Sequence, residues 1–434
     1  MFEKIVAIAA LAAGIAFAQV DPGPRQGPPS GGNPLRGLSQ AEMNFFNEGQ
    51  TRFREVDSVS GTQPGATGSG LGPRFNLNSC AGCHAQPTGG GSSPRINPQI
   101  AMATNFGATN SVPAFIQQNG PVRVVRFVRN ADGSPDGGVH NLFTIAGRSD
   151  AAGCRIAQPD FATAVAQNNA AFRIPTPLYG AGMVEAVADS TILANLAGNA
   201  PLKQQLGIAG HVNRSGNDGT ITRFGWKAQN KSLEIFGGEA YNVEQGVTNE
   251  VFPTERDETP GCGFNTTPED RTDPSATSLL QGISDVTGFT AFLRFLAPPV
   301  PAPDNPSVVN GRGAFTQIGC ALCHTPVLTT GNAASPALRN QQAHLWSDLA
   351  LHNMGAGLAD GIEQGLAQGG DFRTAPLWGL GQRIFFLHDG RTSDLAQAIQ
   401  DHASQGSEAN GVVAGFNALP ARTKQDVMNF LRSL

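Results

Sequence analysis

The stretch "NSCAGCHAQ", residues 78–86, decides how the chain is interpreted, because it holds two cysteines three positions apart and a histidine directly after the second. The spacing returns in "GCALCHTP", residues 319–326, so that the two motifs are Cys80, Cys83 and His84, and Cys320, Cys323 and His324. In c-type haem attachment, two thiols at this spacing bind the haem vinyl groups, and the adjacent imidazole binds the iron. The chain is therefore expected to carry two covalently bound haems c.

Zinc is a poor alternative for these cysteine pairs. Each pair has its histidine fused directly behind it, and no second cysteine pair lies nearby to complete four ligands.

The first residues, "MFEKIVAIAALAAGIAFAQV", combine one lysine with an apolar run and small residues at Ala16 and Ala18. This pattern predicts a signal peptide over residues 1–18. The apolar run is short for a membrane span, so a retained anchor is the less favoured alternative. The mature protein is expected in the periplasm with no membrane span, and export agrees with c-type haem, which is attached on the oxidising side of the bacterial membrane.

Cys154 and Cys262 remain outside the two motifs. In an exported protein two such cysteines are expected to pair, and a bridge closing about a hundred residues is worth up to ~4–5 kcal/mol on the chain-entropy estimate. The alternative is a reactive thiol.

Composition limits the fold and the partners. The net charge of −5 and the absence of a basic run argue against nucleic acid as a partner. The 54 glycines and 30 prolines exceed ordinary usage, whereas charged residues are only 15% of the chain. We therefore expect a mainly α fold with much irregular loop and short β elements.

The pattern along the chain predicts two cytochrome c-like haem domains. Residues 19–38 read as a mobile tether rich in proline and glycine, and "SQAE" at Ser39 is a capping box that begins a helix before the first motif. A proline-rich stretch, residues 296–311, separates this unit from a second helix-then-haem unit. The predicted domains are therefore residues 39–298 and 299–434.

Two further segments indicate regular structure. The stretch "VRVVRFVRN", residues 122–130, reads as a short strand. After Pro420, apolar residues recur at helical spacing and predict a terminal amphipathic helix; they are Val427, Phe430, Leu431 and Leu434.

With these motifs placed, several longer segments resemble one family. They are "GLGPRFNLNSCAGCH", "PTPLYGAGMVEAVADSTIL", "RFGWKAQNKSLEIF", "LWSDLALHNMGAGLAD" and "FRTAPLWGLGQRIFFLHDGRTSDLAQAIQDHASQGSEA". Together, from about residue 70 to the end, they resemble the bacterial di-haem cytochrome c peroxidase superfamily, and most closely its relatives labelled di-haem oxidoreductases or thiol oxidoreductases. The last segment is the most specific.

The resemblance implies different tasks for the two haems. The N-terminal haem, held by His84, would be catalytic and would reduce hydrogen peroxide or a related small oxidant. The C-terminal haem, held by His324, would receive electrons from a small protein such as a cytochrome c or a cupredoxin. His402 stands where the peroxidases place a methionine ligand and is the expected sixth ligand of the C-terminal haem, with His352 and Met354 as rivals.

Peroxide cleavage needs an acid–base group beside the catalytic iron. The resemblance places a glutamate in the segment that here contains Glu244 and Glu239, and Glu185 is a third acid in a family-like segment. The ordinary alternative for each is a solvated or hydrogen-bonded carboxylate.

The resemblance also implies weaker assignments. Trp226 and Trp378 lie in family-like segments and could serve the electron path, although packing is the commoner role of a buried tryptophan. The peroxidases bind calcium between their domains, so the carbonyl oxygens of Thr374 and Pro376 are candidate ligands.

Two other functions compete with the peroxidase-like oxidoreductase. One is a di-haem electron-transfer cytochrome with no substrate site, in which both irons have six ligands. The other is a dioxygen-using di-haem oxygenase. A high-spin haem in the ferric protein would distinguish an enzyme from the pure carrier.

Overall fold

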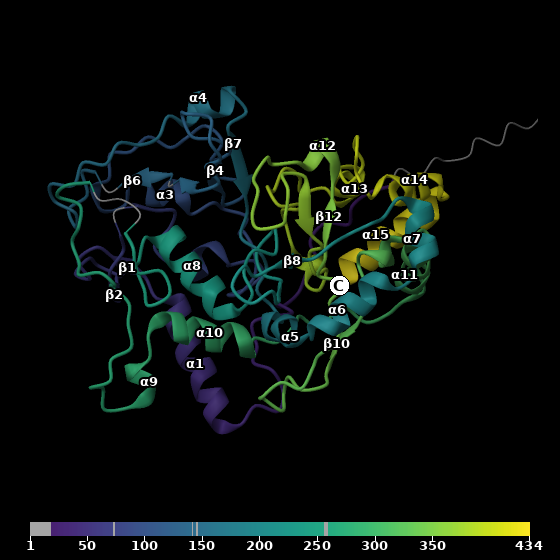
Figure 1. Cartoon of the computed structure of the whole chain (residues 1–434), viewed down its shortest axis with the longest axis horizontal. Coiled ribbons are helices and arrows are strands. Elements are labelled where there is room, and N and C mark those ends of the chain that lie inside the picture. Colours follow the sequence, from purple (N-terminus) through teal and green to yellow (C-terminus); the bar gives the residue numbers. More distant parts are fainter. Residues whose placement is uncertain (1–18, 73, 141, 145, 256–258) are drawn as a thin grey trace, which may run out of the picture.

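The computed structural model describes residues 19–72, 74–140, 142–144, 146–255 and 259–434 (Figure 1). The helices, in chain order, are α1 (Gln40–Arg54), α2 (Cys80–Cys83), α3 (Gln99–Met102), α4 (Phe161–Ala166), α5 (Ala181–Ala186), α6 (Asp189–Ala197), α7 (Ala200–Leu206), α8 (Leu233–Gln245), α9 (Leu279–Gly282), α10 (Asp285–Phe295), α11 (Pro306–Gln317), α12 (Gly355–Leu358), α13 (Leu395–Gln400), α14 (Asn410–Ala418) and α15 (Ala421–Ser433). Short 3-10 helices are η1 (Asn105–Gly107), η2 (Cys320–Leu322) and η3 (Leu380–Gln382).

The strands are all short. They are β1 (Asp57–Ser58), β2 (Gly68–Ser69), β3 (Arg74–Phe75), β4 (Val124–Phe127), β5 (Val139–His140), β6 (Phe143–Thr144), β7 (Ala170–Arg173), β8 (Asn213–Arg214), β9 (Ile221–Thr222), β10 (Leu328–Thr329), β11 (Gln342–Ala343), β12 (Leu351–Asn353) and β13 (Asp371–Arg373). The largest described sheet is antiparallel with the order β5-β4-β7, and its centre is the strand expected within residues 122–130. The prediction of a mainly helical fold with much loop and short β elements is confirmed.

The N-terminal unit is built on the crossing of α1 and α10. α1 begins at the expected capping box, in which the Ser39 backbone N–H donates to the Glu42 carboxylate over 2.7 Å. The helices touch at Gly49, where a Cβ atom would collide with the carbonyl oxygen of Gly288. This close approach lets the ring of Phe53 pack 4.8 Å from that of Phe292.

The C-terminal unit repeats this arrangement with α11 and α15. A Cβ atom at Gly311 would collide with the carbonyl oxygen of Asp426 on α15. Four residues after this glycine, as in α1, a phenylalanine follows: Phe315 packs 5.4 Å from Phe430. α15 buries the apolar residues that its spacing predicted, which are Val427, Phe430, Leu431 and Leu434.

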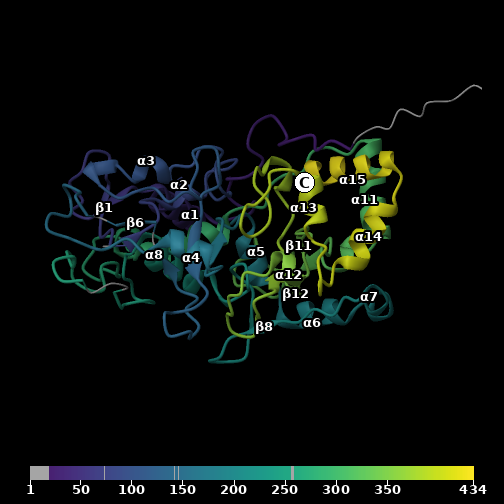
Figure 2. The ribbon, with the colours of Figure 1, turned by 90° about the horizontal axis from the view of Figure 1, so that it is seen from above.

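The two units lie side by side (Figure 2), and the chain between them serves both. Helices α6 and α7 fall within the predicted N-terminal domain, but both views place them beside the C-terminal unit. The Asn195 side chain on α6 donates to the Thr325 hydroxyl over 3.0 Å, directly after the second haem motif. The region 39–298 therefore supplies part of the wall around the C-terminal motif.

Residues 19–38 are not a free tether in the structure. The Asp21 carboxylate pairs with Arg432 on α15 at 2.5 Å and accepts the backbone N–H of Leu395 at 2.8 Å. The Leu35 N–H donates to the Phe295 carbonyl at the end of α10. The segment is thus a strap that crosses from the C-terminal unit to the N-terminal unit. Extended proline-rich chain can form such contacts without a helix or a strand, which is why its composition suggested mobility.

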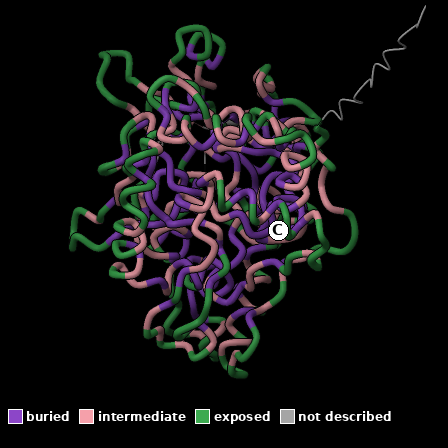
Figure 3. Tube along the Cα trace, turned by 90° about the vertical axis from the view of Figure 1, so that its right-hand side faces the viewer, coloured by how far each residue is buried: buried purple, intermediate pink, exposed green. Residues whose placement is uncertain are grey.

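Buried and exposed chain segregate in the expected way: the interior segments are buried and the peripheral loops are exposed (Figure 3). The predicted signal peptide, residues 1–18, lies outside the described residues. Within the described part of the chain, no helix has both the length and the apolar character that a membrane crossing requires.

The glycine at the second crossing offers a matched test. Gly311→Ala should lower the free energy of unfolding by about 1–3 kcal/mol, because the new methyl group overpacks the contact with α15. Gly313 lies on the same helix with open space around its Cβ position, so Gly313→Ala should instead raise the free energy of unfolding by about 0.5–1 kcal/mol. Denaturant unfolding followed by circular dichroism measures both. Equal effects of the two substitutions would contradict the close crossing.

Candidate functional site

Each Cys-x-x-Cys-His motif lines a large cavity. The N-terminal cavity has Cys80, Cys83 and His84 in its wall, faces α8, and has an empty volume of about 1100 Å³ including its opening to solvent. The C-terminal cavity is lined by Cys320, Cys323 and His324 and has an empty volume of about 1360 Å³ by the same measure. Most of the remaining wall of each cavity is apolar. Two apolar cavities, each with two thiols and an imidazole in its wall, fit two haems c.

The two motif histidines are held by the same kind of hydrogen bond. The Nδ1 of His84 lies 2.9 Å from the Gly91 carbonyl oxygen, and the Nδ1 of His324 lies 3.0 Å from the Trp346 carbonyl oxygen. Because a carbonyl only accepts, each Nδ1 carries the hydrogen and each Nε2 keeps its lone pair for a metal. Burial lowers the pKa of each imidazole to about 4, so that both rings are neutral.

A phenylalanine supports each of these rings. Phe53 lies 6.1 Å from His84 and Phe315 lies 6.2 Å from His324, measured between ring centroids. The two glycine-dependent helix crossings therefore place equivalent aromatic rings against equivalent histidines.

His402 lies in the wall of the C-terminal cavity together with His324. It follows the end of α13, and its Nδ1 lies 2.7 Å from the Ala398 carbonyl oxygen, which again leaves Nε2 with a lone pair. Burial is the main cause that lowers the pKa of His324, and electrostatic repulsion by His402, from the wall of the same cavity, is the second. Burial also lowers the pKa of His402, which favours the neutral ring.

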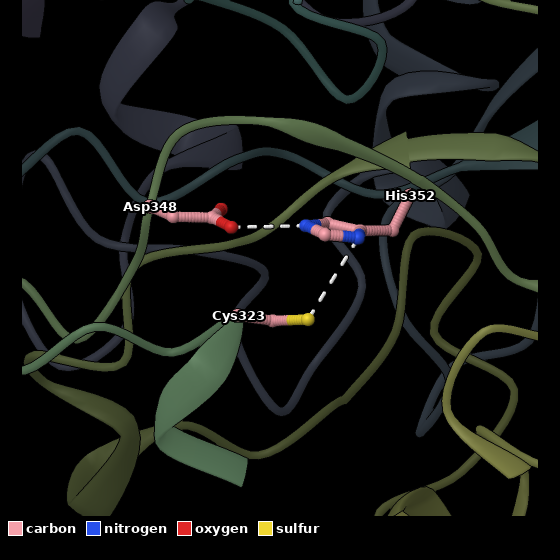
Figure 4. Close-up of side chains that lie close together, drawn as sticks. All are labelled: Cys323, Asp348 and His352. Atoms are coloured by element: carbon pink, nitrogen blue, oxygen red, sulfur yellow. Dashed lines mark hydrogen bonds and ion pairs between the residues drawn. The ribbon is translucent and has the colours of Figure 1, made fainter. Parts of the chain in front are cut away.

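His352, the first rival of His402, has both ring nitrogens engaged (Figure 4). Its Nε2 donates to the Asp348 carboxylate over 2.9 Å and its Nδ1 donates to the Glu408 carboxylate over 2.7 Å. Although burial alone would lower the pKa of His352, the Asp348 charge raises it well above its usual value. An imidazolium held by two carboxylates has no lone pair for iron. Met354 also lines the C-terminal cavity and remains the other rival.

Cys323, Asp348 and His352 bring three metal-ligand atoms within 4.8 Å of one another. The Nδ1 of His352 lies 3.7 Å from the Cys323 sulfur. Since Cys323 belongs to the haem motif and both imidazole nitrogens already face carboxylates, this cluster fits a charge network at a haem edge better than a separate metal site.

Buried arginines give an independent test of the haem fit. Arg373 and Arg383 line the C-terminal cavity, and neither forms an ion pair with any described residue. Burial lowers the pKa of each to about 10. In the N-terminal cavity the buried Nε of Arg126 has no hydrogen-bond partner. A buried guanidinium without an anion is costly, and the two propionates of a haem would supply the missing anions.

Two of the three predicted glutamates line the N-terminal cavity. Glu244 and Glu239 both project from α8. The Glu244 carboxylate accepts the Asn76 side-chain N–H over 2.8 Å, and the Glu239 carboxylate accepts that of Asn230. The buried amide oxygens of Gln229 and Gln245 line the same cavity without a partner, so this wall offers several polar atoms to a small molecule.

Glu185 does not line the cavity. Its carboxylate accepts the backbone N–H of Leu233, the first residue of α8, over 2.9 Å and pairs with Arg294 on α10 at 2.8 Å. A carboxylate at a helix N-terminus satisfies an otherwise free donor. Glu185 therefore fixes the position of α8, the helix that carries the other two glutamates.

Trp226 lines both cavities, and its indole N–H donates to the Ile174 carbonyl oxygen over 2.9 Å. Trp378 lies in the wall of neither haem cavity but is packed against Gly180. Of Trp226 and Trp378, only Trp226 stands between the two sites.

Calcium is not supported at the candidate carbonyl oxygens. The Thr374 oxygen accepts the Ser347 hydroxyl over 2.6 Å and the Arg373 guanidinium over 3.3 Å. A carbonyl oxygen already facing a cationic donor is a poor ligand for a second cation.

The two cysteines outside the motifs are joined in the structure. Cys154 and Cys262 form a disulfide with an S–S distance of 2.03 Å, buried in the N-terminal unit and away from both cavities. Sequence reasoning did not identify Arg126, Arg383 or Glu408. Arg383 and Glu408 lie in a family-like segment, but nothing in the sequence shows that a guanidinium will be buried without a partner.

Comparison with known proteins identifies a family for the chain. Residues 131–434, more than half of the chain, match the family model described as "Di-haem oxidoreductase, putative peroxidase". Among solved structures, a hydrazine synthase of Kuenenia stuttgartiensis is similar at 12% identity with a TM-score of 0.36, covering 100% of both chains. A MauG-like protein associated with microbial copper homeostasis is similar at 16% identity with a TM-score of 0.28, covering 57% of this chain and 89% of that one. These scores are too low to carry a conclusion, and no curated protein matches the chain.

Removal of single thiols tests the haem fit. Cys80→Ala and Cys320→Ala should each impair covalent haem attachment at one site only, because each cavity holds its own thiol pair. The pyridine haemochrome assay should give two covalent haems per wild-type chain and fewer in each variant, down to one. A folded wild-type protein without covalent haem would overturn the assignment of both cavities.

Proposed function

The chain belongs to the di-haem oxidoreductase family, and on that premise we propose that it is a periplasmic enzyme in which the two cavities have different tasks. The C-terminal cavity would hold the haem that accepts electrons from a small redox protein, such as a cytochrome c or a cupredoxin. The N-terminal cavity would hold the haem at which hydrogen peroxide or a related small oxidant is reduced. When bound, the haems supply the redox chemistry of iron.

A difference between the cavity walls carries this proposal. The C-terminal cavity offers His402 and Met354 in addition to His324. Among the described residues that line the N-terminal cavity, His84 is the only histidine and there is no methionine. One site can therefore saturate its iron with protein ligands, as an electron carrier requires, whereas the other leaves a side open to a small molecule and places glutamates there.

The glutamates fit a proton-transfer role. Reduction of peroxide to water requires two protons and two electrons, and a positioned carboxylate can carry a proton from one oxygen atom to the other. Glu244 is held by Asn76 and Glu239 by Asn230, so each carboxylate has a fixed orientation in the cavity wall. Glu185 serves this chemistry only by holding α8 in place.

Electrons must cross from one cavity to the other. Trp226 contributes to both walls and is fixed by its bond to Ile174. We assign the path between the two haems to this side chain.

The glutamates are tested by replacing the ionisable group while keeping its shape. If Glu244 is the proton carrier, Glu244→Gln should lower peroxide turnover by ~10²–10⁴ with both haem spectra unchanged. Glu239→Gln tests the second candidate. Glu234 is exposed on the same helix, so Glu234→Gln should keep wild-type turnover and is the matched control.

Wild-type turnover in both Glu244→Gln and Glu239→Gln would remove the carboxylate shuttle from the mechanism. If the wild-type protein showed no reaction with peroxide and two low-spin haems, the alternative of a di-haem electron-transfer cytochrome would take its place.

The electron path makes a separate prediction. Trp226→Phe should slow oxidation of the C-terminal haem after rapid mixing of the reduced protein with peroxide, because a phenyl ring is harder to oxidise than indole. Trp378→Phe, which changes a tryptophan outside both cavities, should leave this rate as in the wild type. Equal rates in wild type and Trp226→Phe, followed by stopped-flow absorbance, would exclude a special role for Trp226.

A further inference from the structure

Three segments of the chain meet at His352. The side chain is only 3% exposed and lies on β12, which pairs with β13. Its Nε2 binds Asp348 from the preceding loop, and its Nδ1 binds Glu408 from the loop that follows α13 (Figure 4 shows the Asp348 side of this network). The third segment passes at Gly210, where a Cβ atom would lie 2.6 Å from the His352 ring and the backbone φ is +65°. Glycine is suited to both conditions.

Glu408 is the centre of this junction. One carboxylate oxygen accepts the backbone N–H groups of Ala209 and Gly210 at 3.0 Å in addition to the His352 Nδ1 at 2.7 Å. The other oxygen accepts the Asn353 N–H at 3.2 Å. Burial alone would raise the pKa of Glu408, but the bond and charge of His352 together with the backbone N–H groups of Asn353 and Ala209 outweigh it, and the pKa is lowered. The carboxylate is therefore ionised and carries four donors from two other segments.

The same loop carries His402. The Ser407 hydroxyl donates to the His402 carbonyl oxygen over 2.6 Å, and the Glu408 N–H donates to the Asn353 carbonyl oxygen over 2.9 Å. The Ser404 hydroxyl donates to the Met354 carbonyl oxygen over 3.2 Å. α13 ends at Gln400. His402 is still bonded to α13 through Ile399 and Ala398. The residues that follow are tied to the His352 strand by the bonds above, with further bonds to α12 and to Asn410.

We propose that the ion pair of His352 and Glu408 is a positioning device that holds the loop 401–409 closed over the C-terminal cavity and so keeps His402 opposite His324. His352 is thus a positioning residue and not an iron ligand. The inference rests on the proposed function in one respect, namely that His402 is the sixth ligand of the C-terminal haem.

The geometry explains why a histidine is needed at this place. A neutral amide could bind one carboxylate, but a protonated imidazole donates from both ends and links Asp348, a fully buried residue, to Glu408 on the loop. Its ring also lies 3.7 Å from the Cys323 sulfur, so the device joins the haem-attachment segment to the loop that closes the other face.

The experiment compares four variants of the full-length haem protein in the ferric state. His402→Gly is the reference, and it should convert the C-terminal haem from low spin to high spin. His352→Gln and Glu408→Gln should each weaken His402 ligation by at least about ten-fold, since loss of one partner of a buried ion pair is strongly unfavourable. His211→Gln is the control, because the His211 side chain is 42% exposed and pairs with Asp371 and not with Glu408, so this variant should behave as the wild type.

The readouts are the high-spin signal per haem in the electron paramagnetic resonance spectrum and the reduction potential of the C-terminal haem. His352→Gln and Glu408→Gln, the two clamp variants, should both gain the high-spin signal seen in His402→Gly and should shift the reduction potential of the C-terminal haem. The N-terminal haem should keep its wild-type spectrum. Because the two residues act as one unit, the double variant should be about as affected as each single variant.

The outcomes distinguish a failure of the ligand assignment to His402 from a failure of the positioning role of His352 and Glu408. If His402→Gly leaves the C-terminal haem low spin, the ligand assignment of the proposed function fails and Met354→Ala becomes the test. If His402→Gly converts the haem but both clamp variants stay fully low spin with an unchanged potential, the positioning role is refuted. If Glu408→Gln lost covalent haem or circular dichroism signal, Glu408→Asp, which keeps the charge on a shorter side chain, would take its place: a gain of high-spin signal over the wild type is expected, and a wild-type spectrum would equally refute the role.

Discussion

The close crossing of two helices at a glycine is the constraint on which both halves of the molecule depend. At Gly49 and at Gly311 the backbone of the partner helix occupies the space of a side chain. The phenylalanine one turn further on then packs against the partner helix and lies beside the motif histidine. Each motif histidine is further fixed through Nδ1 by a backbone carbonyl, so its orientation is set by main chain and by an aromatic ring.

On this shared scaffold, the walls of the two cavities differ. α8 places two glutamates and the unpartnered amide oxygen of Gln245 in the wall of the N-terminal cavity. The loop after α13 places His402 in the wall of the C-terminal cavity. The same helix crossing thus supports two cavities whose walls offer different side chains. What distinguishes the sites is therefore the chain opposite the motif.

The sequence predicts those features that depend on local patterns. The two haem motifs, the capping box at Ser39, the strand around Val125 and the terminal helix can each be read from spacing alone. The roles of acids and histidines cannot, because they depend on distant partners: Glu185 and Glu244 are both glutamates in family-like segments, yet one binds the start of α8 and the other faces a cavity. Likewise His352 and His402 differ only in what their ring nitrogens meet. The contacts of residues 19–38 cannot be read from the sequence for the same reason, since the partner of Asp21 lies 411 residues away.

That separation has a consequence for biogenesis. The bond between Asp21 and Arg432 joins the first described segment to the last helix, so the Asp21 end of the strap can dock only after α15 has packed on α11. The Leu35 end binds the end of α10 and does not depend on that step. Until the C-terminal unit assembles, the surface near Gln382 stays uncovered and the residues around Asp21 stay accessible to proteases.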